Sequence, residues 1–246
     1  MTAGPTGRWG VTVVVLAKAP MAGRSKTRLC PPYSPEQAAA LAQAALEDTL
    51  ATVLATPGVR PVLALDGEPG CWLPVGLPVI AQRRAGLAER IAGALEDAVG
   101  LRGAPVLLIG MDTPQLGPAL LGSACAALLG GACAALLGGP AAARPDAVLG
   151  LAADGGWWAL GLHEPSEQLL VGVPMSTRHT GLAQRQRLLD AGLGVHDLPV
   201  LQDVDTAGDA HDVARLAPTT RFAALLGSLA CSVVPPAGRE PVEGAA

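Results

Sequence analysis

The sequence predicts a single α/β domain built on a mostly parallel sheet with helices on both faces. Short, strongly apolar runs alternate with longer segments that carry apolar residues at helical spacing. The apolar runs lack the polar–apolar alternation of a half-exposed strand, as is typical of strands buried on both faces. The 246 residues are enough for one large core and short for two. Strands that alternate with helices in this way form parallel sheets covered by helices.

The first strand and the first helix carry the clearest signals. Val11–Ala17 is a mostly β-branched apolar run and is predicted to be a buried strand. A helix is expected from Pro35 to about Ala55. Its start is marked by Ser34 as N-cap, by a proline at the first helical position and by Gln37, which completes a capping box.

The same patterns predict the remaining elements in order along the chain. Further strands are expected at Val59–Leu65, Leu77–Ala81, Pro105–Ile109, Ala147–Leu151 and Val195–Leu201. Further helices are expected at Leu87–Val99, in the uncharged region after Asp112, and at Leu182–Ala191, Asp209–Leu216 and Phe222–Leu229. The domain is expected to cover residues 11–216, after an N-terminal tail at 1–10. The stretch 217–246 carries the last short helix and ends in a Pro/Gly-rich segment that is predicted to be disordered.

Charge and composition exclude several classes of protein. The formal net charge of −4 and the scarcity of aromatic residues argue against a nucleic-acid partner, because such binders present basic faces and often stack bases on aromatic rings. The five cysteines form no CxxC pair, which indicates reduced thiols and a cytoplasmic protein. Nothing in the sequence specifies an oligomeric state.

An uncharged segment lies between Asp112 and Arg144 and is long enough to span a bilayer. It is rich in alanine and is interrupted by prolines and glycines, so no membrane span is expected. The octamer Ala-Cys-Ala-Ala-Leu-Leu-Gly-Gly occurs twice in it, at 124–131 and at 132–139. Two copies of eight residues do not make a solenoid, and we interpret them as a local duplication that lengthens one helix and its loop.

A basic, glycine-containing segment follows the first predicted strand. It carries Lys18, Gly23, Arg24, Lys26 and Arg28. Ligands of parallel sheets bind beyond the carboxyl ends of the strands, so this segment is placed to hold a di- or triphosphate. Gly23 lets the backbone approach the ligand, Lys26 adds a point charge, and Arg28 offers a forked contact to phosphate oxygens. The segment is not a Walker A loop, and a solvated basic turn is the alternative interpretation.

Aspartates follow two other predicted strands. Asp112 lies three residues past the strand that ends at Ile109, where a metal bound to phosphate would lie. Asp203 and Asp205 follow the last sheet strand, and alternate carboxylates of an extended segment point to one side. Carboxylates suit Mg²⁺ or Mn²⁺, which take further ligands from water and substrate phosphate. The alternatives are a turn-forming or helix-capping Asp112 and an ordinary acidic cap at the later pair.

A third group of residues follows the strand predicted to end at Leu151. Asp154 is followed by Gly155 and Gly156, which indicates unusual backbone geometry or close contact with a ligand. Trp157 and Trp158 come next and would form an apolar wall for a sugar or a base. The alternative is a tight Asp-Gly turn beside two core tryptophans.

Together these motifs resemble the DUF2064 group of glycosyltransferase-A-like (GT-A-like) proteins, which are labelled radical-SAM/selenodomain-associated transferases or arsenosugar-pathway glycosyltransferases. The signature of that group, K-A-P-x-x-G-x-x-K-T-R-L, G-x-D-x-P-x-L, D-G-G-Y and D-[IV]-D-T, corresponds to residues 18–29, 110–116, 154–157 and 203–206. A further match is Pro174–Thr177, where the group has W-S-T. The resemblance covers about residues 11–216. The chain departs from the pattern at Trp157, Trp158 and Met175, which stand where the group has two tyrosines and a tryptophan.

The resemblance implies a GT-A-like, Rossmann-like fold of the nucleotide-diphospho-sugar transferase superfamily. By analogy, the nucleotide phosphates would be held by Lys18, Arg24, Lys26 and Arg28. Asp112 would bind the Mg²⁺ or Mn²⁺ ion, and Asp205 with Asp203 would complete its coordination. The donor and acceptor would meet in a pocket that includes Asp154, Gly155, Gly156, Trp157, Ser176 and Thr177.

Three functions fit these residues. The first expectation is glycosyl transfer from a nucleotide-diphosphate sugar to a small-molecule acceptor, with Asp154 orienting or deprotonating the acceptor. The second is nucleotidyl transfer from a nucleoside triphosphate to a phosphorylated small molecule, which the basic segment after the first strand favours. The third is a nucleotide-binding protein without activity, against which the complete set of Lys26, Arg28 and the aspartates argues.

Overall fold

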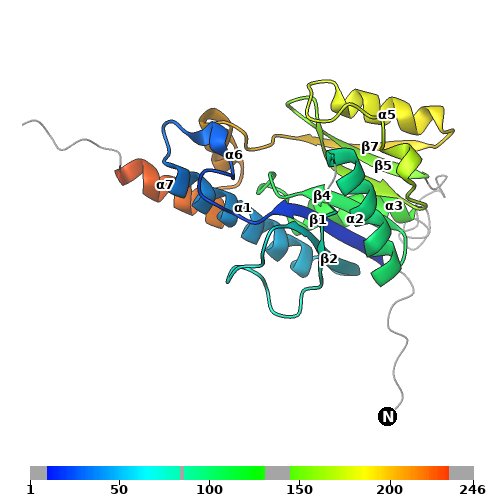
Figure 1. Cartoon of the computed structure of the whole chain (residues 1–246), viewed down its shortest axis with the longest axis horizontal. Coiled ribbons are helices and arrows are strands. Elements are labelled where there is room, and N and C mark those ends of the chain that lie inside the picture. The colour runs from blue at the N-terminus through cyan, green and yellow to red at the C-terminus, as the bar shows by residue number, and fades with distance from the viewer. Residues whose placement is uncertain (1–9, 84–85, 131–144, 233–246) are drawn as a thin grey trace, which may run out of the picture.

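The computed structural model describes residues 10–83, 86–130 and 145–232, and these contain one seven-stranded sheet (Figure 1). The strands lie in the order β3-β2-β1-β4-β6-β5-β7. Their bounds are Val11–Lys18 for β1, Val59–Asp66 for β2, Val79–Ala81 for β3, Val106–Gly110 for β4, Ala147–Ala152 for β5, Trp157–Leu162 for β6 and Val195–Leu201 for β7. The predicted α/β class and the mostly parallel sheet are confirmed.

Strand β6 is the exception to the parallel arrangement. It pairs antiparallel with both β4 and β5, whereas the other neighbouring strands pair parallel. Strand β6 was not predicted from the sequence, because Trp157 and Trp158 were interpreted as a wall of the site or as core residues beside a turn, and not as the start of a strand. A tight turn at Ala153–Gly156 joins β5 to β6, with Gly155 N–H donating to the Ala152 carbonyl at 3.0 Å. The turn that carries the predicted site residues is therefore also a hairpin connection.

Helices cover both faces of the sheet, as predicted, because the strands are apolar on both sides. On one face, α1 (Pro35–Ala55) and α3 (Pro118–Leu129) pack against strand residues such as Val13 and Val15. On the other face, α2 (Leu87–Arg102) and α5 (Thr180–Asp190) pack against residues such as Val14. Figure 1 shows α2 and α5 over the same side of the strands.

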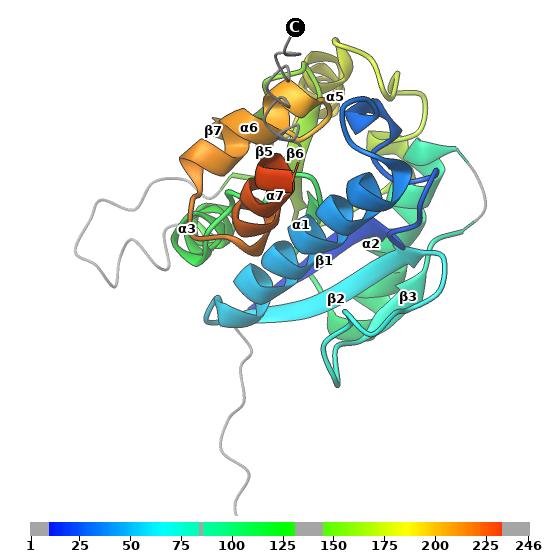
Figure 2. The ribbon, with the colours of Figure 1, turned by 90° about the vertical axis from the view of Figure 1, so that its left-hand side faces the viewer.

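A third helical layer lies outside α1. The short helix η1 (Thr27–Leu29), α6 (Ala207–Leu216) and α7 (Arg221–Ser232) share a core with the outer face of α1. Figure 2 shows α7 lying over α1, on the side away from β1 and β2. The buried Asp48 carboxylate of α1 accepts from the backbone N–H groups of Arg221 and Phe222, at 3.0 and 2.9 Å. The first turn of α7 is thus capped from α1, and the helix expected at Phe222–Leu229 falls within α7.

The start of α1 follows the predicted capping box. Ser34 Oγ accepts from Gln37 N–H at 3.2 Å, and Gln37 Oε1 accepts from Ser34 N–H at 2.8 Å. This helix is long and apolar enough to cross a membrane by length and composition alone. Its apolar residues are used otherwise, since one face packs on the sheet and the other on α6 and α7.

Some expectations lie outside the described residues. The first octamer copy begins inside α3, but the second copy at 132–139 is not described. The same holds for the tail before residue 10 and for the C-terminal segment after residue 232.

A further short helix, η2 (Glu167–Leu169), lies between β6 and α5 in the chain.

Candidate functional site

One cavity of about 720 Å³ opens at the carboxyl ends of the parallel strands. Its walls come from the segments after β1, β3, β4, β5 and β7, and from the loop between η2 and α5. Twelve residues proposed from the sequence line it: Lys18, Arg24, Lys26, Arg28, Asp112, Asp154, Gly156, Trp157, Ser176, Thr177, Asp203 and Asp205. The structure thus brings together four motifs that are far apart in the chain.

Two of the proposed glycines, Gly23 and Gly155, do not line the cavity. Gly23 has φ +72 in the segment after β1, and a side chain there would meet no atom within 4 Å. Gly155 has φ +92, and a Cβ there would overlap the backbone carbonyl of Arg178. Gly155 therefore allows the turn after β5 to contact the loop before α5.

The β1 loop, residues 18–28, is tied to the acidic part of the cavity through Lys26. This residue has φ +51, a left-handed conformation that non-glycine residues rarely adopt. Its Nζ lies 2.7 Å from Asp112 Oδ1 and 3.6 Å from Asp205 Oδ1, and it also donates to the Val204 carbonyl. Arg28 adds an ion pair to Asp205, with Nη1 and Oδ2 3.2 Å apart.

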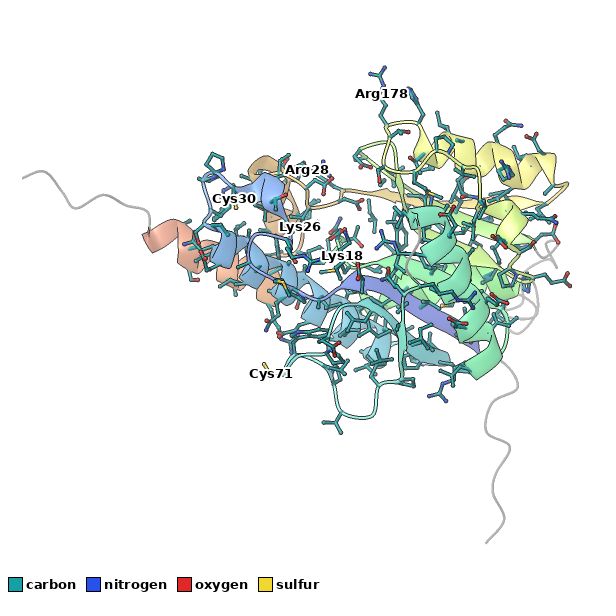
Figure 3. The ribbon with its side chains drawn as sticks, in the orientation of Figure 1. Lys18, Lys26, Arg28, Cys30, Cys71 and Arg178 are labelled. Atoms are coloured by element: carbon teal, nitrogen blue, oxygen red, sulfur yellow. The ribbon has the colours of Figure 1, made fainter. Side chains whose placement is uncertain are left out.

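Three of the loop's cations remain accessible to a ligand. The Arg28 side chain is 73% exposed, and Lys18 and Arg24 are also exposed. Neither Lys18 nor Arg24 forms an ion pair with a described residue. Figure 3 shows Lys18, Lys26 and Arg28 in one region of the molecule, and Arg178 on a separate loop.

The two aspartate segments are held side by side by the backbone. Val204 N–H donates to the Asp112 carbonyl at 2.9 Å, and Gln115 Nε2 donates to the Gln202 carbonyl at 2.6 Å. The N-cap of α3 is Gly117, so Asp112 does not cap that helix. Asp112 instead presents its carboxylate to the cavity, where Oδ1 pairs with Lys26.

Asp203 has the most perturbed carboxyl group of the site. One of its oxygens, Oδ1, is buried without a hydrogen-bond partner in the described part of the chain. Burial is the largest cause that raises the pKa of Asp203 to about 7. The carboxylates of Asp112, Asp154 and Asp205 raise this pKa as well, while Lys26 opposes them. Burial and the neighbouring carboxylates therefore favour the protonated form of Asp203.

These residues fit a divalent ion in their donor chemistry. Mg²⁺ and Mn²⁺ prefer carboxylate oxygens, and the unpartnered Asp203 Oδ1 is such a donor. Within residues 10–83, 86–130 and 145–232, however, no three His, Cys, Asp or Glu side chains are arranged to hold a metal ion. The Lys26 ammonium lies among the carboxylates instead, between Asp112 and Asp205.

The opposite part of the cavity is built from the β5–β6 turn and the loop before α5. Asp154 Oδ1 accepts from Gly156 N–H at 2.8 Å, which orients the carboxylate in its turn. Trp157 lines the cavity, and its buried Nε1 has no partner within the described residues. Trp158 is 2% exposed and its Nε1 donates to the Pro199 carbonyl at 2.9 Å. Of the two tryptophans, Trp158 is thus largely a core residue.

Several cavity residues were missed from the sequence. Gln82, Arg90, Thr113, Arg178 and Asp209 all line the cavity. Gln82 directly follows β3, so the rule that directed attention to strand ends would have found it. Thr113, next to Asp112 after β4, would have been found by the same rule. Arg90 is placed by tertiary contacts, such as the 3.1 Å ion pair between its Nη1 and Asp66 Oδ2.

Comparison with known proteins places these motifs in a family. Residues 40–177 match the sequence model of the family described as "Uncharacterized protein conserved in bacteria (DUF2064)". A protein named phosphoenolpyruvate guanylyltransferase, from Salinispora arenicola (strain CNS-205), is 33% identical over 236 residues, covering 93% of this chain and 97% of the relative. The chain belongs to the DUF2064 family. The resemblance seen in the sequence motifs is confirmed.

A solved structure shares the fold of this DUF2064 protein. It is a candidate nucleotide-diphospho-sugar transferase from Desulfovibrio desulfuricans G20, with a TM-score of 0.78 and 22% sequence identity. The alignment covers 90% of this chain and 95% of that chain. At this identity the likeness concerns the fold, which agrees with the GT-A-like architecture expected from the sequence.

Proposed function

We propose that this DUF2064 protein is a metal-dependent nucleotidyltransferase. It would transfer the nucleotidyl group of a nucleoside triphosphate to a phosphorylated small molecule and release pyrophosphate. The observation that carries the proposal is the pairing of the β1 loop with the aspartates across one cavity, with Lys26 Nζ 2.7 Å from Asp112. The name of the Salinispora relative, a guanylyltransferase acting with phosphoenolpyruvate, supports the same reaction class.

The β1 loop suits a triphosphate better than a neutral ligand. Lys18 and Arg24 have no carboxylate partner among the described residues, and Arg28 is mostly exposed although it pairs with Asp205. Charge-assisted hydrogen bonds from these groups are stronger than neutral ones. Negative charge grows on the leaving pyrophosphate in the transition state, so cations fixed around it lower the barrier.

The metal would be held by Asp112 with Asp203 and Asp205. When bound, it would supply charge stabilisation to the phosphate oxygens. Of these three aspartates, Asp203 has a buried oxygen, Oδ1, that forms no hydrogen bond with the described residues and could therefore coordinate the metal. Lys26 keeps this acidic cluster partly neutralised and lies next to the phosphates that the β1 loop would bind.

The remaining residues position the second substrate. An oxygen of the acceptor phosphate would attack the α-phosphorus, and the bond from that phosphorus to the bridging oxygen of pyrophosphate would break. No proton has to be removed from an ionised acceptor phosphate, so Asp154 would orient the acceptor. Its Oδ1 is held by Gly156 N–H.

Glycosyl transfer from a nucleotide-diphosphate sugar is the second candidate. Trp157 favours it, because its half-buried indole lines the cavity and apolar rings bind sugar faces. The same cations would then stabilise a leaving nucleoside diphosphate, and Asp154 would deprotonate an acceptor hydroxyl.

A thermal-shift panel of nucleoside triphosphates and nucleotide sugars, each with and without Mn²⁺, separates these candidates. A ligand at about one hundred times its Kd adds roughly 2.7 kcal/mol of stability, which gives a clear shift. We expect Mn²⁺-dependent stabilisation by one triphosphate, and pyrophosphate release when an acceptor phosphate is added. Stabilisation by a nucleotide sugar alone would favour glycosyl transfer, and no shift with any ligand would contradict both.

A matched pair of variants links the result to the cavity. Asp112→Asn is expected to remove the Mn²⁺ effect. Asp97→Asn changes an aspartate of α2 that pairs with Arg83 outside the cavity, and it is expected to behave as wild type. Binding of nucleotide without any turnover would instead support the inactive nucleotide-binding protein.

A further inference from the structure

Two non-glycine residues in the described part of the chain have positive φ angles, and both line the cavity. They are Lys26 at +51 and Ser176 at +57. The left-handed conformation costs such residues about 1–2 kcal/mol, so it persists only where surrounding contacts impose it. The function proposed above uses Lys26. Ser176 is the second strained residue of this cavity, and it lies in the loop before α5.

The turn at residues 174–180 is held rigidly by its own hydroxyl groups. Thr180 Oγ1 donates to the Pro174 carbonyl at 2.8 Å and accepts from Thr177 N–H at 3.0 Å. Thr177 Oγ1 accepts from His179 N–H at 3.2 Å. By contrast, Ser176 is exposed and its hydroxyl has no hydrogen bond to any described residue. The hydroxyls of Thr177 and Thr180 thus form hydrogen bonds within the turn, whereas the hydroxyl of Ser176 is available to a ligand in the cavity.

Two glycines hold the 174–180 turn against the turn that carries Asp154. A Cβ on Gly155 would overlap the Arg178 carbonyl, and a Cβ on Gly181 would overlap the Gly156 carbonyl. Gly181 N–H also donates to the Gly155 carbonyl at 2.8 Å. The backbone of Arg178 is therefore fixed against Gly155, the residue that follows Asp154.

Arg178 carries a charge that no described carboxylate neutralises. Its Nε donates to the neighbouring His179 Nε2 at 3.1 Å, and it forms no ion pair within the described residues. Arg178 is exposed and lines the edge of the cavity, and in Figure 3 its side chain projects outward from the loop, away from Lys18, Lys26 and Arg28. Lys26 and Arg28, in contrast, are already paired with aspartates.

We propose that Arg178, with the Ser176 hydroxyl, binds an anionic group of the acceptor, either a carboxylate or a phosphate. Arginine presents a forked set of donors that matches both groups. The β1 loop already supplies cations for the nucleotide, and Arg178 comes from a different loop beside Asp154. The inference rests on the proposed function in that it assigns this group to the second substrate. A neutral sugar or alcohol has no anionic group for Arg178 to bind, so we expect it to be a poor acceptor.

Direct binding measurements test the role of Arg178 without requiring turnover. We would titrate phosphoenolpyruvate, inorganic phosphate and glycerol calorimetrically into wild type, Arg178→Ala, Arg178→Lys and Arg102→Ala. Each titration would be made with and without the triphosphate found in the thermal-shift panel. Arg102 is an exposed arginine at the end of α2 and does not line the cavity, so Arg102→Ala is the matched control.

We expect wild type to bind at least one of the two anions and not glycerol. Arg178→Ala should weaken anion binding at least tenfold, which corresponds to about 1.4 kcal/mol, and Arg178→Lys should recover part of the loss. Triphosphate affinity should stay within about twofold in all variants. In turnover assays, Arg178→Ala should raise the KM for the acceptor and leave the KM for the nucleotide unchanged.

Other outcomes overturn the inference. The first is that wild type binds neither anion. The second is that Arg178→Ala binds the anion as tightly as wild type. The third is that Arg178→Ala loses as much affinity for the triphosphate as for the anion, which would place Arg178 in the nucleotide site. If wild type binds anions through Arg178 but binds no nucleotide, the proposed function fails and the anion site stands. If nucleotide binds and Arg178→Ala changes nothing, only the acceptor inference fails.

Discussion

The β1 loop and the 174–180 turn form different parts of the same cavity and are held in different ways. The β1 loop is fixed by long-range ion pairs from Lys26 and Arg28 to Asp112 and Asp205. The 174–180 turn is fixed by short-range hydroxyl bonds and by close packing on Gly155. The stability of the first arrangement should depend on charge, pH and salt, whereas that of the second should depend on the volume of the packed side chains. Substitutions that change charge without volume, or volume without charge, should therefore separate the two.

Loss of the Lys26 ammonium should give the largest effect. Lys26→Ala leaves the Asp112 and Asp205 carboxylates without their shared cation, so turnover should fall at least about 100-fold and triphosphate affinity about 10–100-fold. Lys26→Gly removes the same cation but relieves the left-handed backbone, and it should be equally impaired yet more stable than Lys26→Ala. Steady-state kinetics and thermal unfolding would measure both. Full activity in Lys26→Gly would show that the backbone, and not the charge, matters.

A methyl group at Gly155 should disrupt the packing of the 174–180 turn. Gly155→Ala combines a positive φ with an overlap on the Arg178 carbonyl, whereas Gly192→Ala has a similar φ of +77 and no atom within 4 Å. The strain alone should cost about 1–2 kcal/mol of unfolding free energy in both variants. Gly155→Ala should lose more, and it alone should lose anion binding while keeping triphosphate binding. Equal stabilities measured by urea unfolding would contradict the packing argument.

The protonation of Asp203 should make stability depend on pH. Its pKa is raised from the ordinary value of 3.8 to about 7, so between these pH values the native protein keeps a proton that the unfolded chain has lost. Stability should therefore fall as pH rises through this window, by up to about 1.4 kcal/mol per pH unit. Asp203→Asn removes this cost, so the variant should be more stable than wild type at pH 8 in EDTA, with the difference vanishing near pH 4. Added Mn²⁺ should stabilise wild type and not the variant; a variant less stable than wild type at pH 8 in EDTA would contradict the assignment.

The smallest effect is expected at Arg24. This exposed side chain has one described contact, from Nη1 to Met21 Sδ at 3.9 Å, and no ion pair with a described residue. Arg24→Ala should weaken triphosphate binding by about 0.5–1 kcal/mol, roughly twofold to fivefold, without changing stability. Because exposed charges are screened, the difference should shrink as salt rises. A loss that does not depend on salt would indicate a buried contact instead.

Local patterns were enough to predict most of the fold and many of the residues that line the cavity. The capping box at Ser34 and Gln37 and the apolar run of β1 depend on neighbouring residues, so they could be read from the sequence. The rule that ligands bind at strand ends selected Lys26, Asp112 and Asp203, which the structure places around one cavity. Strand β6 was missed because its antiparallel pairing with β4 is a long-range property that the Trp157–Leu162 pattern does not reveal.

What the sequence determined by itself was the order of the elements, the kind of sheet and the motifs at its edge, because hydrophobic periodicity and capping act over a few residues. Only the tertiary structure decided that Lys26 would lie between Asp112 and Asp205, and that burial would raise the pKa of Asp203. It also decided that the backbone of Arg178 would lie against Gly155 in the turn that carries Asp154. Charge pairing, desolvation and close packing depend on distances between segments far apart in the chain, and those distances exist only once the sheet has formed.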